Sequence, residues 1–489
     1  MIKKIFLGFV LLSSLFIQAQ NDAEITRETV SRSAIEGHIY FLASDELKGR
    51  ETGSPEINIA AEYLATSLRR FGVKPVPGAE EGYFQPVELE TVQPATSKRL
   101  TLGEFNTENM IILAGSNGQD TREAVFAGYG MEEDYEGKNV TDKFVFVLAG
   151  KEGEGDANSS FRLASSKRAV AKSKGAVGLV EINAFGANIW YRFSNYFGRA
   201  STQVKAENTS DFIHLWVQDP DDKLLTAAKE KNASAKVEID GIARTPIPAK
   251  NVVGMVEGTD PKLKDEFVIY SAHYDHIGVG QTNAEGDSIY NGARDNAVGA
   301  VTVLSAAENI AKYPTKRSAL FILFTAEEKG LLGSKWYADH PLIPLNKMVY
   351  CFNSDNGGYN DTSVATIVGL GRTTAEKHIK IACQEFGLEA IDDPAPEQGL
   401  FDRSDNVSFA AKGVPAPTFS LGFRAFDAEI GKYYHQTSDN PDNLDYDYLT
   451  KFFGAYVLAC RLIADDPVTP FWVEGDKYHA AGEMLYAEK

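Results

Sequence analysis

The feature that most constrains the fold is an apolar run at residues 319–324, which is followed almost at once by Glu327 and Glu328. A short, continuous run of this kind predicts a strand buried on both faces, as in a parallel sheet covered by helices. Ligands of such sheets gather outside the carboxyl ends of the strands, where these two acids stand. Adjacent residues in extended backbone point opposite ways, so one acid can bind a cation while the other faces what the cation activates. A solvated acidic pair at a helix start is the alternative.

Strands and helices alternate along the chain around this run. Strand-like runs and helical patterns occupy residues 267–272, 297–311, 348–352, 364–368, 374–386 and 446–463. Alternation of this kind is typical of α/β proteins with a largely parallel sheet. We therefore expect an α/β fold whose central sheet is mixed, mostly parallel and flanked by helices.

The length of 489 residues predicts two domains, one of them inserted in the other. Between residues 113 and 247, short β-like runs alternate with polar stretches, which indicates a small β-rich inserted domain that a proline-punctuated linker ends. Residues 21–112 and 248–466 are expected to form the main domain, and residues 467–489 a C-terminal tail.

The first 20 residues have the pattern of a signal peptide. Lys3 and Lys4 precede an apolar stretch too short to be a comfortable membrane span, and Ala19 is a small residue before the expected cut. We therefore expect export to the periplasm or the outside of the cell. No later segment reaches the length of a transmembrane helix, so no membrane anchor is expected in the mature chain.

Charge and cysteine content exclude some classes of function. A formal net charge of −19 argues against nucleic acid or an anionic membrane as partner. Cys351, Cys383 and Cys460 lie in apolar or helical patterns, and an odd number in an exported chain gives no disulfide framework. We expect them to be buried as small apolar residues rather than to bind zinc.

Histidines and carboxylates follow several of the predicted strands. His273 and Asp275 leave the strand at residues 267–272 together. Imidazole is a common zinc ligand, and a ligand histidine usually gives its other N–H to a carboxylate, for which Asp275 is the candidate. Asp295 precedes a predicted helix, and its two oxygens can bridge cations about 3.5–4 Å apart. Asp355 ends a further strand, and His435 lies in a late loop.

Each of these residues alone reads equally as a turn or a cap, but together they predict a metal centre. In this order they resemble peptidase family M28, the co-catalytic zinc aminopeptidases. The resemblance is carried by His273-Tyr274-Asp275, residues 295–299, residues 324–334, Asn353-Ser354-Asp355 and Tyr434-His435. Residues 42–50, 126–130 and 175–178 are similar to members that carry an inserted protease-associated domain. Nearly all of the chain between the signal peptide and residue 463 is covered.

The resemblance implies a zinc-exopeptidase fold of the phosphorylase/hydrolase-like type and a centre of two Zn²⁺, for which Mn²⁺ or Co²⁺ are alternatives. One cation would be held by His273 and Asp355, the other by Glu328 and His435, with Asp295 bridging. Hydrolysis would use metal-activated water with Glu327 as general base and Asp275 orienting His273. Tyr434 is a candidate donor to the developing oxyanion.

The sequence departs from the family pattern at two places. Arg294 stands where many relatives carry an acid, and it is expected to pair with a carboxylate of the protein or of a substrate. Residues 403–406 end in Asn406 where relatives often have histidine. The resemblance implies an aminopeptidase acting on peptides. A carboxypeptidase-type member, a zinc-dependent glutaminyl cyclase and a non-catalytic receptor-like module remain alternatives, and the oligomeric state is not indicated.

Overall fold

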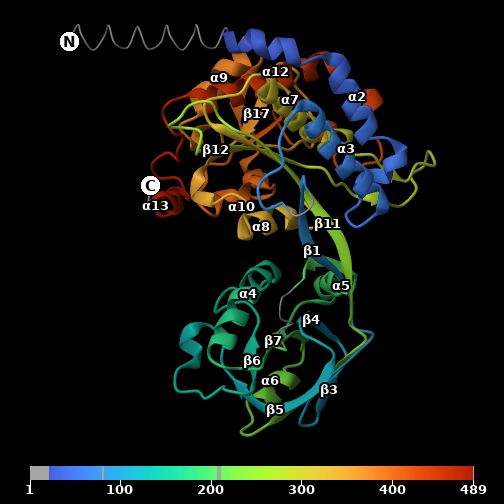
Figure 1. Cartoon of the computed structure of the whole chain (residues 1–489). Helices are drawn as coiled ribbons and strands as arrows, with labels where there is room; N and C mark the ends of the chain where they lie inside the picture. Colours follow the sequence, from blue (N-terminus) through green and yellow to red (C-terminus); the bar gives the residue numbers. More distant parts are fainter. Residues whose placement is uncertain (1–20, 80–81, 206–210, 488–489) are drawn as a thin grey trace. The chain divides into compact units, whose positions relative to one another are not determined.

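The computed structural model describes residues 21–79, 82–205 and 211–487, so the predicted signal peptide lies outside the described residues. The chain divides into two compact units (Figure 1). The first unit consists of Met1–Glu88 and Pro248–Lys489, and the second consists of Leu89–Ile247. The insertion was predicted at residues 113–247, and the second unit spans Leu89–Ile247.

The earlier start follows from strand pairing. Strands β2 (Ser97–Leu102) and β4 (Met110–Ala114) lie before residue 113 or end just after it. β2 pairs with β10 (Ser234–Asp240), and β4 pairs with β9 (Ile213–Gln218). Both partners belong to the second unit, more than 90 residues further along the chain, so the sequence near residue 113 carries no local mark of the boundary.

The first unit is organised around a mixed sheet. Its strands, in spatial order, are β18 (Glu389–Asp392), β17 (Val364–Val368), β19 (Thr418–Leu421), β16 (Met348–Ser354), β12 (Phe267–His273), β15 (Ser318–Phe324) and β11 (Ala243–Val256). The chain passes into the second unit within β1 (Phe84–Gln93), whose residues in that unit pair with β8 (Ser201–Val204). β12 pairs in parallel with β15 and β16, and β16 pairs in parallel with β19. β17 and β11 run antiparallel to β19 and β15. The predicted α/β fold with a mixed, mostly parallel sheet is confirmed.

Alternation along β15 assigns its side chains to the two faces of the sheet. Ala319, Phe321 and Leu323 join one apolar core, and Leu320, Ile322 and Phe324 join the other. All seven residues of the strand are buried, as the continuous apolar run predicts. The helices that contribute to the first core are α2 (Arg32–Leu42), α3 (Pro55–Phe71), α7 (Gly299–Lys312), α9 (Glu376–Glu385) and α12 (Tyr446–Asp465). The second core includes residues of α8 (Leu332–Asp339), α10 (Asn406–Ala410) and α13 (His479–Tyr486).

The predicted C-terminal tail is part of the first unit. Trp472 is 2% exposed, and its indole Nε1 donates to the backbone oxygen of Gly413 at 2.9 Å. Arg372 forms an ion pair with Asp476 at 2.6 Å. Buried aromatic surface and a paired arginine therefore hold this segment to the second core.

The second unit contains an eight-stranded sheet in the order β3-β2-β10-β5-β6-β7-β9-β4. Its remaining strands are β3 (Phe105–Thr107), β5 (Gly118–Phe126), β6 (Phe144–Leu148) and β7 (Gly178–Asn183), and its helices are α4 (Ala157–Ser173), α5 (Ala187–Phe197) and α6 (Lys223–Ala228). β5, β6, β7 and β9 pair in parallel. The unit combines this sheet with the helices α4, α5 and α6, and its relation to protease-associated domains stays a prediction.

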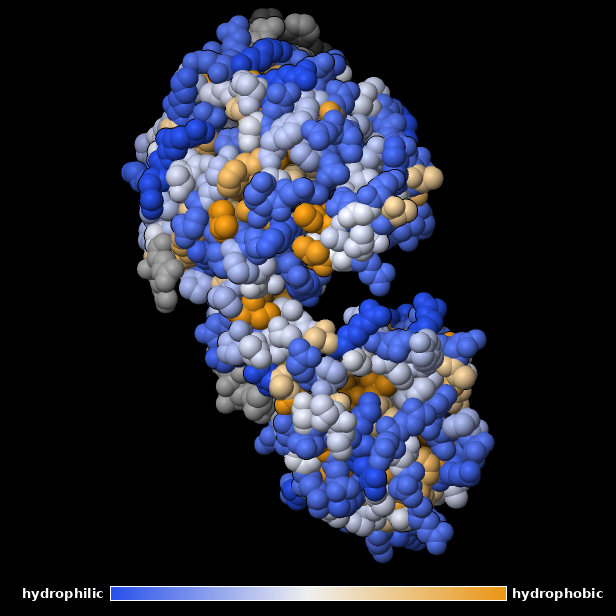
Figure 2. Space-filling model, turned by 90° about the vertical axis from the view of Figure 1, so that its right-hand side faces the viewer, coloured by the Kyte–Doolittle hydropathy of each residue, from blue (hydrophilic) through white to orange (hydrophobic). Residues whose placement is uncertain are grey.

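The surface is predominantly hydrophilic on the face that Figure 2 presents, with hydrophobic residues scattered over it. Large apolar side chains with high exposure include Met484 at 74% and Tyr191 and Tyr196 at 68%. Among the described residues, no helix combines the length and the apolar character that crossing a membrane requires.

Candidate metal centre

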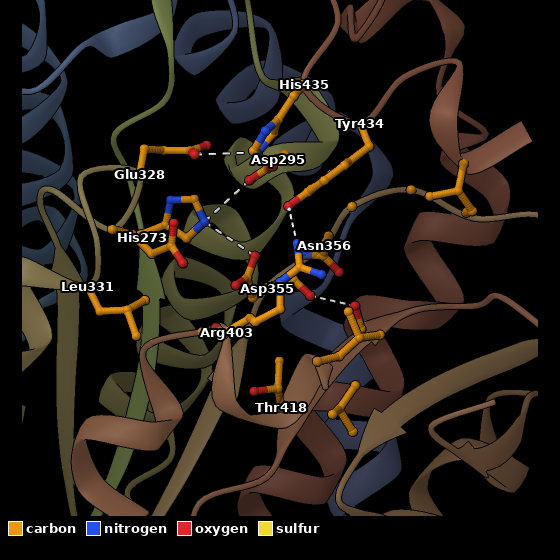
Figure 3. A pocket seen from close by; sticks show the side chains of 18 of the residues that line it. His273, Asp295, Glu328, Leu331, Asp355, Asn356, Arg403, Thr418, Tyr434 and His435 are labelled. Atoms are coloured by element: carbon orange, nitrogen blue, oxygen red, sulfur yellow. Dashed lines mark hydrogen bonds and ion pairs between the residues drawn. The ribbon is translucent and has the colours of Figure 1, made fainter. Parts of the chain in front are cut away.

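Three parallel strands and two loops of the first unit bring the predicted ligands together. His273 is the last residue of β12, Glu327 and Glu328 follow β15, and Asp355 follows β16. Asp295 lies in the turn before α7, and His435 in the loop after α11 (Ala428–Gly431). All of them, together with Tyr434, line one pocket of about 400 Å³ (Figure 3). The expectation that these side chains meet at the carboxyl ends of the strands therefore agrees with the geometry.

The contacts between histidines and carboxylates have the spacing of metal ligands. His273 Nε2 lies 3.2 Å from Asp355 Oδ1 and 3.3 Å from Asp295 Oδ1. His435 Nε2 lies 3.2 Å from Asp295 Oδ2 and 3.4 Å from Glu328 Oε2. Tetrahedral zinc with bonds of about 2.0–2.1 Å separates neighbouring ligand atoms by about 3.3 Å. The donor set therefore fits a pair of cations, with each oxygen of Asp295 facing a different histidine.

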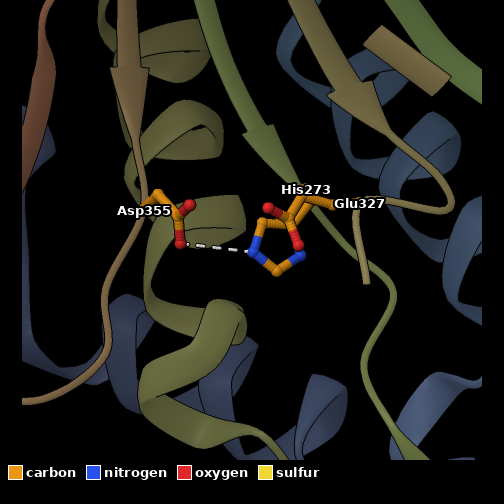
Figure 4. Close-up of side chains that lie close together, drawn as sticks. All are labelled: His273, Glu327 and Asp355. Carbon is orange, nitrogen blue, oxygen red and sulfur yellow. Dashed lines mark hydrogen bonds and ion pairs between the residues drawn. The ribbon is translucent and has the colours of Figure 1, made fainter. Parts of the chain in front are cut away.

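His273, Glu327 and Asp355 form a tighter group within this centre. Their ligand atoms all lie within 4.8 Å of one another, and Figure 4 shows the Glu327 carboxylate beside the imidazole. Burial raises the pKa of Glu327 well above its usual value; His273 opposes this, and Asp355 adds to it. A carboxyl group with raised proton affinity beside the ligands is suited to act as a general base.

The centre concentrates negative charge. Burial acts to lower the pKa of His273, but the carboxylates of Asp355 and Glu327 outweigh it and hold that pKa well above the usual value. Burial acts to raise the pKa of Asp295, and hydrogen bonding to His273 and His435 holds it below the usual range instead. Buried carboxylates that outnumber their positive partners favour a cation as the missing charge.

Asp275 contacts the backbone of the two glutamates more closely than it contacts His273. Its Oδ1 accepts the Glu327 N–H at 3.1 Å, and its Oδ2 accepts the Glu328 N–H at 3.3 Å. The distance from Asp275 Oδ1 to His273 Nδ1 is 3.7 Å, whereas the backbone oxygen of Asp275 lies 3.2 Å from that nitrogen. The carboxylate of Asp275 therefore fixes the turn that presents Glu327 and Glu328, and its backbone oxygen is the nearer acceptor for the imidazole.

Non-glycine residues with left-handed backbone gather at the centre. Ala326 has φ +58°, Leu331 has φ +62° and His435 has φ +57°. Such conformations are uncommon and cluster at functional sites, where the surrounding structure holds them. Ala326 directly precedes Glu327, so this turn sets the direction in which the two glutamates leave β15.

Arg50, which lies within the segment 42–50 of the family resemblance, supports the centre. Its guanidinium donates to the backbone oxygens of Tyr274 at 2.8 Å, Asn291 at 2.7 Å and Gly292 at 2.9 Å, and also to that of Leu42. The side chain is only 1% exposed. Arg50 therefore ties the segment after β12 to the turn that carries Asp295. The sequence signal available for it was an arginine directly after Gly49.

His276 is a second residue that the sequence interpretation missed. It lies three positions after His273, is fully buried, and places Nδ1 2.8 Å from Glu328 Oε1. His276, Asp295 and Glu328 present ligand atoms that all lie within 4.8 Å of one another. The repeated histidine after β12 was the signal for it.

Arg294 pairs inside the protein. Its Nη1 lies 3.0 Å from Asp439 Oδ1 and 2.6 Å from Asn443 Oδ1, and its guanidinium stacks over the Tyr433 ring at 3.7 Å. The side chain is thereby fixed against the loop that carries His435. Of the two partners expected for Arg294, the protein carboxylate is therefore the one that it contacts.

The segment at residues 403–406 contributes in different ways. Asn406 donates to the backbone oxygens of Phe401 and Ala416, which is a structural role. Both carboxylate oxygens of Asp405 are buried without a hydrogen-bond partner, and burial raises the pKa of Asp405 to about 7. Arg403 is exposed, lines the pocket and donates to the Tyr434 hydroxyl at 3.3 Å (Figure 3).

The rest of the pocket has an apolar side and, besides Arg403, a second cationic side chain. The apolar lining consists of Leu331, Val368, Leu400, Phe423, Phe426 and Ile430. Lys335 is exposed at the edge of the same pocket. The pocket therefore offers an apolar wall, two cationic side chains and the carboxylate–histidine centre to one bound molecule.

The fold and the site define an α/β domain with a carboxylate–histidine metal centre at the carboxyl ends of its parallel strands. Residues 251–459 match the model described as peptidase family M28. This match spans the segment that carries His273, Asp295, Glu327, Glu328, Asp355 and His435.

Curated relatives and a solved structure are similar to the chain. Aminopeptidase YwaD of Bacillus subtilis is 27% identical over 234 residues, which cover 47% of this chain and 46% of that protein. A probable leucine aminopeptidase 2 of Aspergillus oryzae is 25% identical over 315 residues, 60% of this chain and 59% of that protein. The chain thus spans about half the length of the curated relatives it matches. The structure of an aminopeptidase from Aneurinibacillus sp. strain AM-1 shares the fold, with a TM-score of 0.55, 22% identity and coverage of 92% of this chain and 97% of that one.

Proposed function

We propose that this protein is an exported zinc exopeptidase that removes amino-terminal residues from peptides. The observation that carries the proposal is the position of Asp295, which offers one oxygen to His273 and the other to His435 while Glu327 lies beside His273. Two-metal hydrolases use such a bridging carboxylate. Its setting in a family M28 domain, with aminopeptidases among the relatives, supports this class of reaction.

The roles of the residues follow from their positions. Bound zinc, held by His273, Asp355, Asp295, Glu328 and His435, would supply a Lewis acid and an activated water. Glu327 takes the proton of the attacking water and passes it to the leaving amine. The Tyr434 hydroxyl, which Arg403 holds by a hydrogen bond, is the candidate donor to the oxyanion. Asp275 holds both glutamates by their backbone N–H groups.

The direction of trimming is the second part of the proposal. The apolar wall suits a hydrophobic side chain of the substrate, and relatives named aminopeptidases favour release from the amino end. Arg403 and Lys335 favour the carboxypeptidase-type alternative, because a cation near the scissile bond can bind a terminal carboxylate. Peptides blocked at either end separate the two: release from carboxy-blocked but not amino-blocked peptides supports the aminopeptidase, and the reverse pattern overturns it.

The Glu327→Gln variant tests the reaction itself. We expect it to retain two equivalents of zinc by elemental analysis and to lose about 10²- to 10⁴-fold in kcat, because general-base catalysis contributes about that much. Glu376→Gln, in an exposed pair with Lys380 on α9, is the matched control and should keep normal turnover. Turnover near normal in Glu327→Gln removes Glu327 from the base role. One equivalent of zinc in the wild type would favour the glutaminyl cyclase alternative, and no hydrolysis with zinc supplied would favour the receptor-like module.

A further inference from the structure

We infer that His276 is a ligand of the second cation, so that this position is held by two imidazoles, His276 and His435, together with Glu328 and Asp295. The inference rests on the proposed zinc centre and extends it by one residue. It changes the composition of the second position from one histidine to two. A position with more imidazole and less carboxylate per cation carries less negative charge and binds borderline metals such as zinc in preference to hard ones.

The first argument is that His276 is buried without a hydrogen bond. Its side chain is fully buried, and neither Nδ1 nor Nε2 has a hydrogen-bond partner within the described part of the chain. A buried polar atom that is left unpaired costs about 1–3 kcal/mol, so such atoms are rare and call for an explanation. A cation at Nδ1 supplies one.

The second argument is the direction in which the ring faces. His276 Nδ1 lies 2.8 Å from Glu328 Oε1 and 4.0 Å from Asp295 Oδ1. Despite the short distance, Nδ1 and Oε1 do not form a hydrogen bond, and Glu328 Oε1 is itself buried without a partner. The lone pairs of Nδ1 and Oε1 face the same space, and no N–H of the ring points at the carboxylate oxygen. This is the arrangement of two ligands of one cation rather than of a donor and an acceptor.

The third argument is that the backbone is shaped to admit this ring. A Cβ at Gly292 would lie 2.6 Å from Cγ and Cδ2 of His276, and Gly292 has φ +61°. The backbone N–H of His276 donates to the backbone oxygen of Arg50 at 3.3 Å, and the guanidinium of Arg50 in turn donates to the backbone oxygen of Gly292. The imidazole is therefore held against the turn of Asp295 by glycine on one side and by Arg50 on the other.

Other buried histidines of the chain differ in this respect. His378 Nε2 lies 2.6 Å from Asp466 Oδ2, His214 Nε2 lies 2.9 Å from Glu181 Oε1, and His38 Nδ1 lies 2.7 Å from the Tyr63 hydroxyl. Each has at least one ring nitrogen paired with a side chain, although Nδ1 of His214 and Nδ1 of His378 are buried without a partner, whereas neither nitrogen of His276 has one. His276 instead faces the ligand atoms of the second cation position.

The decisive experiment counts imidazole ligands in the cobalt-substituted protein. Each histidine bound to Co²⁺ gives one exchangeable, strongly shifted imidazole N–H signal in the proton NMR spectrum. We expect three such signals in the wild type, from His273, His276 and His435, and two in His276→Gln. His378→Gln, which removes a buried histidine paired with Asp466, should keep all three. Two signals in a wild type that holds two cations overturn the inference and leave His276 as a positioning residue for Glu328.

A zinc titration against a chromophoric chelator gives the second readout. His276→Gln should weaken the second equivalent of zinc by at least 100-fold and leave the first within about 10-fold, because removal of an outer-sphere residue costs only about 10- to 100-fold. An unchanged second equivalent overturns the inference. Because the signal count in the wild type decides the question without any variant, a failure of His276→Gln to fold does not leave it open. Failure of the proposed function is distinguished by a wild type that binds zinc at neither position or hydrolyses no peptide.

Discussion

Each unit of this protein contains a buried cluster of ionisable side chains, and the two clusters are satisfied in opposite ways. In the second unit, the Glu181 carboxylate meets three donors: Lys167 Nζ at 3.0 Å, His214 Nε2 at 2.9 Å and Trp216 Nε1 at 3.0 Å. In the first unit, the carboxylates of the metal centre meet only histidines, and Glu328 Oε1 and both nitrogens of His276 have no hydrogen-bond partner. The Glu181 cluster is balanced by protein groups, whereas the carboxylates of the metal centre outnumber the histidines that contact them.

The difference separates a structural cluster from a functional one. A buried charge is tolerated when it is paired and hydrogen-bonded, and Glu181 meets that requirement within its own unit. Despite its burial, hydrogen bonding to His214 and the charge of Lys167 hold the pKa of Glu181 below its usual value. Four carboxylates that converge on a pocket without such donors favour a cation. Burial of charge alone does not identify a site; unsatisfied ligand atoms that face a common space do.

Removal of Glu181 should have the largest effect on stability. Glu181→Ala leaves Lys167 buried without its partner, and breaking a buried pair in this way costs about 3–5 kcal/mol. Urea unfolding followed by Trp216 fluorescence, together with hydrogen exchange in β7 and β9, measures the loss. Glu123→Ala is the control, because its pair with Lys143 is 44% exposed on the glutamate side and should contribute less than about 1 kcal/mol. Equal losses in the two variants would show that the buried Glu181 cluster contributes no more to stability than the exposed pair.

Arg50→Lys should have the next largest effect on the free energy of unfolding. The Arg50 side chain is a buried cation whose hydrogen bonds go to carbonyl oxygens rather than to a carboxylate. Lysine cannot reproduce the fork by which the guanidinium reaches several backbone oxygens. Loss of one or more charge-assisted hydrogen bonds should cost about 2–3 kcal/mol. Zinc affinity should fall as well, because Arg50 holds the segments that carry Asp275 and Asp295. A stable variant with normal zinc affinity would contradict the role of Arg50 in supporting the centre.

Local sequence was sufficient to predict β12, β15, β16 and β17 of the main sheet, but not β11, β18 and β19. β17 (Val364–Val368) was predicted to the residue, and β12 and β15 to within two residues. Strands that are covered by helices on both faces are near-continuous apolar runs, and such runs are visible in the sequence. The start of the second unit was not predictable in this way. It depends on the pairing of β2 and β4 with strands more than 90 residues away.

The centre could be predicted where chemistry coincided with strand ends. His273, Glu327, Glu328 and Asp355 directly follow apolar runs, so periodicity alone places them at one edge. Arg50 and His276 could not be recognised as readily. The role of Arg50 depends on carbonyl groups that only the folded chain brings together, and that of His276 depends on the space left by Gly292. The partners of Glu181, which are Lys167, His214 and Trp216, are likewise brought to it only by packing.

The effect of Glu328→Gln on the free energy of unfolding should have opposite signs in the metal-free and the zinc-bound protein. In the presence of a chelator it removes one of several converging negative charges, and we expect the free energy of unfolding of the first unit to rise by about 1 kcal/mol. With zinc supplied, the variant should be less stable than the wild type, because the ligand is lost and binding to the native state contributes to stability. Thermal unfolding with and without zinc measures both. A decrease in both states would mean that Glu328 is balanced by the protein as Glu181 is.

The smallest effect expected is a pH dependence confined to the second unit. Burial holds the pKa of His214 below 6.5, against the opposing effect of Glu181. The unfolded chain therefore binds a proton near pH 6.5 that the folded chain does not yet bind, so the unit loses stability as the pH falls below about 6.5 and regains none on further acidification. Hydrogen exchange in β9, corrected for intrinsic rates, should show weaker protection at pH 5.5 than at pH 7.5 in the wild type and little change in His214→Gln. An equal pH dependence in His214→Gln would show that protonation of His214 is not its cause. The pair of Glu181 and Lys167 would then account for the charge balance of the cluster without His214.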